Sequence, residues 1–177
     1  MLVRTAELTI QVRSVSQAIG KATSIAESHG GFVERTADRG EESANVLLRV
    51  PAETFKAAMT GFEALGKVTS RNVKEEDVTE QCIDMEAILK NKIALRDRMK
   101  QLLDKTADMK DIIAIEEQLN RLQTDIDSME GKMRSIGRQV EYARVDVCLE
   151  RKPIFGPLGY LVRGFFWGIE KMFLIRD

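Results

Sequence analysis

Five carboxylates close together form the one set of side chains in this sequence whose types and spacing could support chemistry. They are Glu75, Glu76, Asp77, Glu80 and Asp84. Paired carboxylates can exchange protons with a substrate or hold a hard divalent cation. Acidic residues are also favoured in the first turn of a helix, where they compensate the positive end of the helix dipole. A helix start is the interpretation we favour, and a small-ligand or divalent-cation site is the alternative.

Few other residues are of types that commonly act in catalysis or metal binding. The single histidine, His29, precedes Gly30 and Gly31 at an expected helix end, where the helix dipole favours a cation. Cys82 and Cys148 could form a disulfide in an oxidising compartment, but two free, partly buried thiols are the preferred interpretation. We find no zinc-ligand spacing, no glycine-rich phosphate loop and no nucleophile elbow. The sequence therefore predicts that the protein is not an enzyme, with no catalytic residue, metal site or cofactor.

The charges of the chain almost cancel. Its 177 residues include 27 Lys and Arg and 28 Asp and Glu, for a formal net charge of −1. No long block of basic residues creates a local positive field that would attract a polyanion. Hydrophobic residues make up 44% and aromatic residues 6%, which is typical of a folded chain with much helical, water-facing surface. Binding to nucleic acid is therefore not expected.

Residues 1–76 are expected to form most of a small α+β domain. Apolar residues alternate with polar ones at Ala6, Leu8, Ile10 and Val12, as in a half-buried strand. In order, the sequence predicts a strand at 6–12, a helix at 14–30, strands at 32–37 and 46–50, a helix at 51–66 and a strand at 67–75. This β-α-β-β-α-β order is that of the ferredoxin-like split β-α-β fold, with both helices on one face of an antiparallel sheet.

A long helical hairpin is expected at residues 77–138. Apolar residues of its second arm recur at alternating intervals of three and four, the heptad pattern of a coiled coil. They are Ile112, Ile115, Leu119, Leu122, Ile126, Met129, Met133 and Ile136. The first arm has a looser version, at Met85, Ile88, Lys92, Leu95, Met99 and Leu102. A fifth strand at 144–150 would return to the sheet, so residues 139–152 complete a sheet of four or five strands and the antiparallel coiled-coil hairpin is an insertion.

The heptad residues of the two arms form the seam, the face along which the arms are expected to pack. Four further apolar residues are expected beside this seam or near the turn of the hairpin. They are Leu89, Ile93, Leu103 and Ile113. A lone pair of helices would leave them in water, and burying them requires a second hairpin or a contact with the parent domain. We therefore expect these residues to bind a protein partner or a second copy of the chain, which would make it a homo-oligomer.

Residues 153–177 form a distinct third segment. Arg163, Glu170 and Lys171 interrupt its apolar residues, so it is too polar to span a bilayer. Its broad aromatic face is typical of an amphipathic helix lying in a membrane interface. The residues expected to face the membrane surface are Tyr160, Leu161, Phe165, Phe166, Trp167 and Phe173. The alternative is a C-terminal helix docked on the open face of the sheet.

Several short motifs occur in an order that resembles a known family. They are 4–12 (RTAELTIQV), 30–33 (GGFV), 48–52 (LRVPA) with Phe55, 65–70 (LGKVTS), and 77–81 (DVTEQ) with Asp84. Together they resemble the domain of unknown function 4349 family, over nearly the whole chain up to about Glu150. The resemblance implies no activity, but it implies a bacterial lipoprotein or membrane-anchored protein on the extracytoplasmic face of the cell envelope.

The chain departs from the layout that this resemblance implies. Family members typically have an N-terminal signal or lipid-attachment sequence and a transmembrane helix after the domain. This sequence starts with strand-like residues and reaches Asp177 without a spanning segment. It is therefore expected to be either a piece of a longer precursor or a soluble variant.

Two functions from different classes follow from the sequence. The first is a non-catalytic, extracytoplasmic, membrane-associated scaffold or sensor module whose coiled-coil hairpin mediates protein–protein interaction or self-association. The alternative is a small-ligand or divalent-cation-binding domain that uses the acidic cluster from Glu75 to Asp84.

Overall fold

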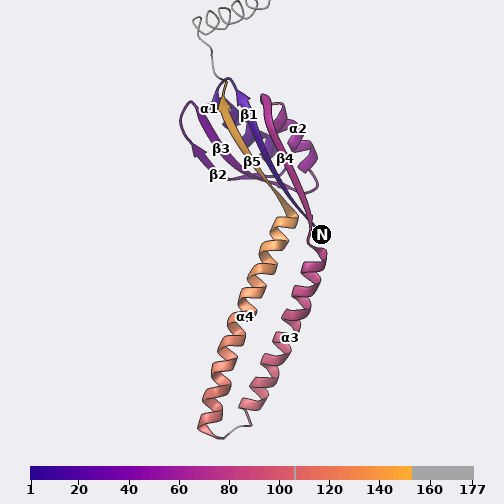
Figure 1. Cartoon of the computed structure of the whole chain (residues 1–177), viewed down its shortest axis with the longest axis vertical. Helices are drawn as coiled ribbons and strands as arrows, with labels where there is room; N and C mark the ends of the chain where they lie inside the picture. The colour runs from indigo at the N-terminus through magenta and orange to yellow at the C-terminus, as the bar shows by residue number, and fades with distance from the viewer. Residues whose placement is uncertain (106, 153–177) are drawn as a thin grey trace, which may run out of the picture.

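The computed structural model describes residues 1–105 and 107–152, and within them the chain forms a sheet domain and a long helical hairpin (Figure 1). The fold is α+β, with a five-stranded mixed sheet and four helices among these residues. In chain order the elements are β1 (Leu2–Val12), α1 (Val15–Ser28), β2 (Phe32–Asp38), β3 (Ser43–Pro51), α2 (Phe55–Glu63), β4 (Lys67–Asp77), α3 (Thr79–Leu103), α4 (Met109–Glu141) and β5 (Tyr142–Arg151).

The sheet has the strand order β2-β3-β5-β1-β4. Neighbouring strands are antiparallel except β1 and β5, which pair in parallel from Thr5–Arg144 to Val12–Arg151. The expected antiparallel sheet is therefore wrong at β5. The chain leaves the sheet at the end of β4 and α4 returns it to the same end, where β1 also begins (Figure 1). A strand that enters the sheet from that end runs in the direction of β1.

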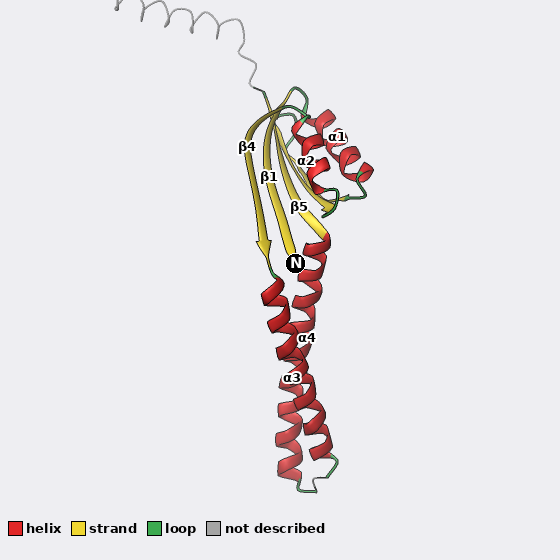
Figure 2. Ribbon diagram, turned by 90° about the vertical axis from the view of Figure 1, so that its right-hand side faces the viewer, coloured by secondary structure: helices red, strands yellow, loops and turns green. Residues whose placement is uncertain are grey.

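Helices α1 and α2 cover one face of the sheet, and the core lies between them and the strands (Figure 2). The strand positions that face these helices are apolar and buried, including Leu8 and Ile10 of β1 and Val145 and Val147 of β5. Phe62 of α2 is the largest fully buried side chain of this core. Burying apolar surface contributes about 25 cal/mol per Å², so this layer supplies most of the stability of the sheet domain.

The ends of the first helix follow the chemistry expected from the sequence. The hydroxyl of Ser14 accepts a hydrogen bond from the Gln17 amide over 3.5 Å at the start of α1. Gly30 follows the helix with φ +78°, a backbone conformation that residues with a Cβ rarely adopt. The second helix differs from the expectation, because Pro51 ends β3 and α2 begins only at Phe55.

The hairpin consists of α3 and α4, which run side by side in opposite directions in both views (Figures 1 and 2). At 1.5 Å per residue, the 25 residues of α3 span about 37 Å and the 33 residues of α4 about 50 Å. Because α4 continues to Glu141, the hairpin is longer than expected and passes directly into β5. None of the described helices is both long enough and apolar enough to cross a membrane.

Candidate functional site

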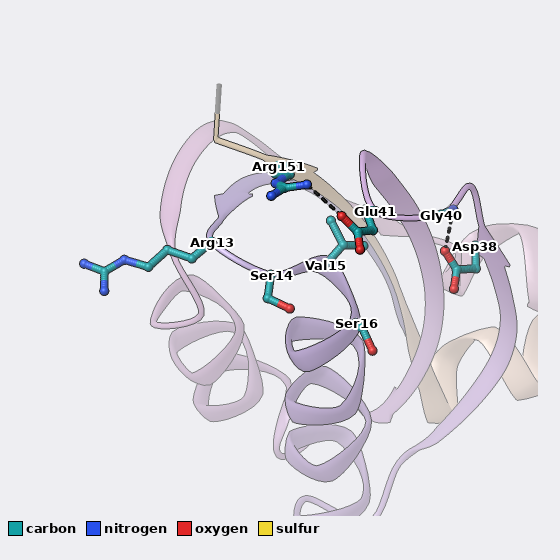
Figure 3. Close-up of a pocket in the computed structure, with 8 residues that line it drawn as sticks. All are labelled: Arg13, Ser14, Val15, Ser16, Asp38, Gly40, Glu41 and Arg151. Carbon is teal, nitrogen blue, oxygen red and sulfur yellow. Dashed lines mark hydrogen bonds and ion pairs between the residues drawn. The ribbon is translucent and has the colours of Figure 1, made fainter. Parts of the chain in front are cut away.

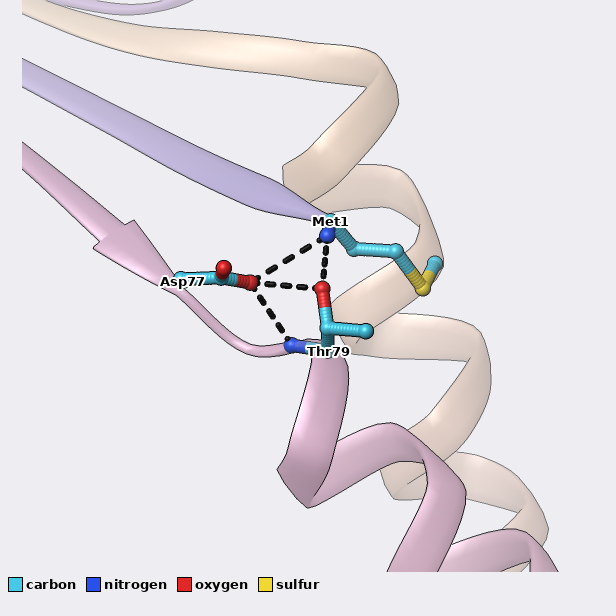
Figure 4. Close-up of polar contacts among 3 residues, drawn as sticks. All are labelled: Met1, Asp77 and Thr79. Atoms are coloured by element: carbon cyan, nitrogen blue, oxygen red, sulfur yellow. Dashed lines mark hydrogen bonds and ion pairs between the residues drawn. The ribbon is translucent and has the colours of Figure 1, made fainter.

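The junction between β4 and α3 contains the most strongly perturbed carboxylate of the described chain (Figure 4). Asp77 Oδ1 accepts hydrogen bonds from the Thr79 hydroxyl at 2.6 Å, the Thr79 amide at 3.0 Å and the Met1 ammonium at 3.2 Å. These donors, the Thr79 hydroxyl first, lower the pKa of Asp77 from 3.8 to about 2. The Met1 ammonium also donates to the Thr79 hydroxyl oxygen. The Asp77 carboxylate thus uses its hydrogen bonds to hold the first residue of α3 in place.

The other carboxylates of the acidic cluster point to separate partners. Glu75 pairs with Arg4 at 3.3 Å and Glu76 with Lys74 at 2.9 Å. Glu80 and Asp84 are exposed on the first turns of α3. Among the described residues no group of three or more His, Cys, Asp or Glu side chains could hold a metal ion. Asp77, Glu80 and Asp84 do line one shallow groove at the base of α3, and the cation-binding alternative stays a prediction.

The histidine and the two cysteines occupy structural positions. His29 Nδ1 lies 2.8 Å from the carbonyl oxygen of Ile25, in the last turn of α1. Cys82 and Cys148 are free thiols, as expected, and both are half-buried. Burial first, and then the nearby Glu150 and Asp146 carboxylates, raise the pKa of the Cys148 thiol. A raised pKa disfavours the nucleophilic thiolate, so Cys148 lacks the environment of a reactive cysteine.

The sheet face opposite α1 and α2 is polar and its charges are largely paired. Arg49 Nε lies 2.5 Å from Glu34 Oε2, and this hydrogen bond is the main cause of the lowered pKa of Glu34. Arg144 lies 3.9 Å from Asp146 on the same face. Phe32 and Tyr142 meet edge to face, with ring centroids 5.7 Å apart. Paired charges and one aromatic contact do not define a ligand site.

The face of α3 that packs against α4 is marked by half-buried residues at alternating intervals of three and four. They are Cys82, Met85, Leu89, Lys92, Arg96, Met99 and Leu103. The ion pair between Lys92 Nζ and Asp125 Oδ2, 2.6 Å apart, shows that this face turns toward α4. On α4 the facing residues are those expected, and Leu122 and Ile126 are buried. None of the described residues of α3 is fully buried.

This face differs from the predicted first-arm seam at every second position. Leu89 and Leu103, expected beside the seam, lie in it, and Ile93 is half-buried next to it. Ile88 and Leu95, expected in the seam, are 46% and 49% exposed. The heptad pattern alone did not separate the two choices, because Met85, Lys92 and Met99 belong to both.

A second apolar stripe, called the outer stripe below, therefore lies on the exposed flank of α3 beside this face. It consists of Ile88, Leu95 and Leu102, which recur every seven residues and are all exposed. Ile88 also lines a shallow groove of about 500 Å³ with Met85 and Met129, and Glu80 and Asp84 form its acidic rim. On α4, Ile113 near the turn is 59% exposed. A helix with two apolar stripes is typical of one that packs between two partners.

Charge is distributed unevenly along both arms. Residues 79–86 of α3 contain Glu80, Asp84 and Glu86 and no cation. Residues 90–100 contain one acid and five cations, Lys90, Lys92, Arg96, Arg98 and Lys100. The Lys92–Asp125 contact sets the acidic stretch 114–127 of α4 beside this basic part of α3. The two arms are thus complementary in charge only when they run in opposite directions.

Two hollows lie at the end of the sheet farthest from the hairpin. Figure 3 shows the first, of about 390 Å³, where Arg151 Nη1 pairs with Glu41 Oε2 at 2.9 Å and Asp38 accepts from the Gly40 amide at 2.8 Å. Arg13 points away from these residues. The second hollow, of about 420 Å³, is lined by the same Arg13 together with three lysines, Lys21, Lys67 and Lys152. Among the described residues, no acidic side chain lines this second hollow, which we call the basic hollow.

A family model described as Domain of unknown function (DUF4349) matches residues 1–158. The chain belongs to this family. The match takes in every element from β1 to β5, so the sheet domain and the hairpin together make up the DUF4349 region. No curated protein and no solved structure matches the chain.

One sequence-based candidate of this DUF4349 domain is not described by the structure, and one feature of the structure was not predicted. The residues expected to face the membrane, from Tyr160 to Phe173, lie outside the described residues. The basic hollow was missed because its four cations come from four separate parts of the sequence. Only the strand order brings the ends of β1, β4 and β5 together with α1.

Proposed function

We propose that this DUF4349 domain is a non-catalytic adaptor module on the extracytoplasmic face of the membrane, whose hairpin self-associates with the hairpin of a second copy. The outer stripe of α3 carries the proposal, since Ile88 and Leu95 are about half exposed although they recur at heptad spacing. Membrane association is proposed from the sequence of residues 153–177 and from the resemblance to membrane-anchored relatives. The separate ion pairs of Glu75 and Glu76 and the raised pKa of Cys148 support a non-catalytic role.

The proposal also includes an interpretation of the sheet and one of the helical hairpin. We interpret the sheet as a ferredoxin-like arrangement in which β5 is inserted between β1 and β3. The β-α-β-β-α-β order and the placement of both helices on one face support this interpretation. We interpret α3 and α4 as a coiled coil because the half-buried residues of both helices recur at intervals of three and four.

Charge favours a second copy as the occupant of the outer stripe. When two hairpins lie side by side and point the same way, α3 of one copy runs antiparallel to α4 of the other. The acidic start of α3 then lies near Lys132, Arg134 and Arg138 of the second α4, and its basic part near Glu116, Asp125 and Asp127. Contact of α3 with the α3 of such a copy would instead oppose like charges. Both copies would also present their residues 153–177 to the same membrane.

The size of the hairpin is sufficient for a stable dimer. A face about 37 Å long and two helices wide, at about 10 Å per helix, offers roughly 700 Å² per copy. Stable interfaces bury roughly 600–1,000 Å² per partner, so this area lies within their range. The groove beside Ile88 and Met129 would accept an apolar side chain of the second copy at the base of this interface.

The test is the molar mass of the full chain in solution, measured by sedimentation equilibrium. We expect a dimer for the natural sequence and a monomer for the double variant Ile88→Glu/Leu95→Glu. The matched control is Ala87→Glu/Ala94→Glu, which adds the same charges at the same spacing to exposed positions of α3 outside both stripes. Circular dichroism must show equal helix content in all three proteins. A monomeric natural sequence, or a control that dissociates equally, would refute self-association and leave a different helical protein as the partner to seek.

A further inference from the structure

The basic hollow described above lies at the end of the sheet domain opposite the hairpin. Arg13 follows β1, Lys67 begins β4, Lys152 follows β5, and Lys21 lies on α1. Figure 1 shows that these strand ends meet where the described chain stops. The hollow has a volume of about 420 Å³, and the described residues that line it include four cations and no acidic residue.

The four cations of the hollow have no acidic partner within the described chain. None of them takes part in an ion pair with a described residue, whereas nearby Arg151 pairs with Glu41 and Arg71 with Glu63. Lys152 makes one hydrogen bond, from its backbone amide to the carbonyl oxygen of Val12. Unpaired cations around one hollow produce a positive potential that attracts anions from solution.

The start of α1 adds to this potential. The helix begins at Val15, beside Arg13 and Ser14, and its first turn contains no acidic residue. The amides of a helix N-terminus carry the equivalent of about half a positive charge, which favours phosphate groups. Here that end of the dipole is not compensated by a carboxylate of its own helix.

The charge excess extends over the whole end of the domain. Arg39 and Arg151 join the four cations of the hollow. The acidic residues there are Asp38, Glu41 and Glu42 at the β2–β3 turn and Glu150 near the end of β5. Six cations therefore lie among four carboxylates, although the chain as a whole has a net charge of −1. The positive charge is a local feature of this surface.

We propose that this end of the domain docks on anionic lipid headgroups, with the hollow between Arg13, Lys21, Lys67 and Lys152 receiving a headgroup phosphate. A lipid is favoured over a soluble anion because Lys152 leads directly into residues 153–177, whose sequence is rich in aromatic and apolar residues. The hairpin then points away from the membrane, toward its partner. The inference rests on the membrane association in the proposed function and is independent of hairpin self-association.

The experiment is flotation of the full chain with vesicles of phosphatidylcholine alone or of phosphatidylcholine with phosphatidylglycerol. The variant Lys21→Gln/Lys67→Gln removes two cations of the hollow. The matched control Lys100→Gln/Lys110→Gln removes two exposed lysines near the turn of the hairpin. Each lysine near an anionic surface changes affinity roughly fivefold, so the hollow variant should bind phosphatidylglycerol vesicles at least about tenfold more weakly. The control should bind as the natural sequence does, and added salt should remove the difference.

Three outcomes would overturn the inference. The two variants could bind equally, or the natural sequence could bind neutral vesicles as strongly as anionic ones, so that residues 153–177 alone account for binding. Absence of any flotation would refute membrane docking together with the membrane part of the proposed function. Sedimentation of the same proteins keeps the hypotheses apart, because Lys21→Gln/Lys67→Gln leaves both helices of the hairpin unchanged.

Discussion

Lys92 of α3 and Asp125 of α4 form an ion pair with Nζ and Oδ2 2.6 Å apart, at the middle of the hairpin. The pair lies in the contact between the helices, although Lys92 is 29% exposed and Asp125 57% exposed. Arg96 follows in the same face and bonds to its neighbour Asp97. The centre of the contact is therefore polar on the α3 side. This explains why α4 buries Leu122 and Ile126 while α3 buries no described residue completely.

Replacing Lys92 by leucine should stabilise the hairpin. The ion pair is partly exposed, and such pairs contribute about 0–1 kcal/mol. A leucine that is two-thirds buried contributes about 1–2 kcal/mol through apolar burial. Asp125 remains exposed enough to be hydrated. We expect Lys92→Leu to raise the free energy of unfolding by roughly 1 kcal/mol, measured by urea denaturation followed by circular dichroism.

The control for this prediction is Lys90→Leu, two residues earlier on the same helix. Lys90 is exposed, so its replacement buries little and should change stability by less than about 0.5 kcal/mol. If Lys92→Leu destabilised the protein more than Lys90→Leu did, the ion pair would contribute more than its exposure suggests.

Much of the fold could be predicted from local sequence patterns. Alternation at Leu8 and Ile10 identified β1, and the spacing of Ser14 and Gln17 identified the start of α1. The heptad pattern of α4 predicted the residues that face α3, although the helix continues beyond the pattern to Glu141. These signals are local, since each depends on the period of a single element.

The features that sequence patterns could not provide are those set by contacts between distant segments. The parallel pairing of β5 with β1 depends on the hairpin returning the chain to the end of the sheet from which it left. The alternative seams of α3 share Met85, Lys92 and Met99, so only the packing against α4 separates Leu89 from Ile88. The basic hollow likewise joins residues as distant as Arg13 and Lys152.

The Asp77 carboxylate provides a test of the junction between the sheet and the hairpin. Thr79 supplies the two strongest causes of its lowered pKa, through its hydroxyl and its amide. We expect Thr79→Val to raise the pKa of Asp77 from about 2 part of the way toward 3.8, because valine keeps the amide donor and loses the hydroxyl. Thr79→Ser keeps both donors and should leave the pKa near about 2. Titration of the carboxyl carbon by NMR measures both values.

The same carboxylate determines how the junction responds to acid. The folded pKa of Asp77, about 2, lies below its ordinary value of 3.8, so ionised Asp77 stabilises the folded state fully above that ordinary value. The contribution is lost as the pH falls through the folded pKa. Below the folded pKa, Thr79→Val and Thr79→Ser should therefore have the same free energy of unfolding. As the pH rises above the folded pKa, Thr79→Val should become the less stable of the two. Equal acid unfolding of the two variants throughout would contradict the role of the hydroxyl.

Gly66 shows why one of the family motifs contains a glycine. It lies between α2 and β4, where an added Cβ would overlap the Gln11 carbonyl oxygen and lie 3.1 Å from Ile10 Cγ2 and Val12 Cγ1. Gly66→Ala must displace the backbone of β1, which we expect to cost about 1–3 kcal/mol. Gly20 in the middle of α1 is the matched control, because nothing lies within 4 Å of a Cβ there. Gly20→Ala should instead stabilise the protein by about 0.5–1 kcal/mol, since alanine loses less backbone freedom in a helix. Urea denaturation of the two variants should give opposite signs, and a neutral Gly66→Ala would show that β1 and the α2–β4 turn are not packed as closely as this geometry requires.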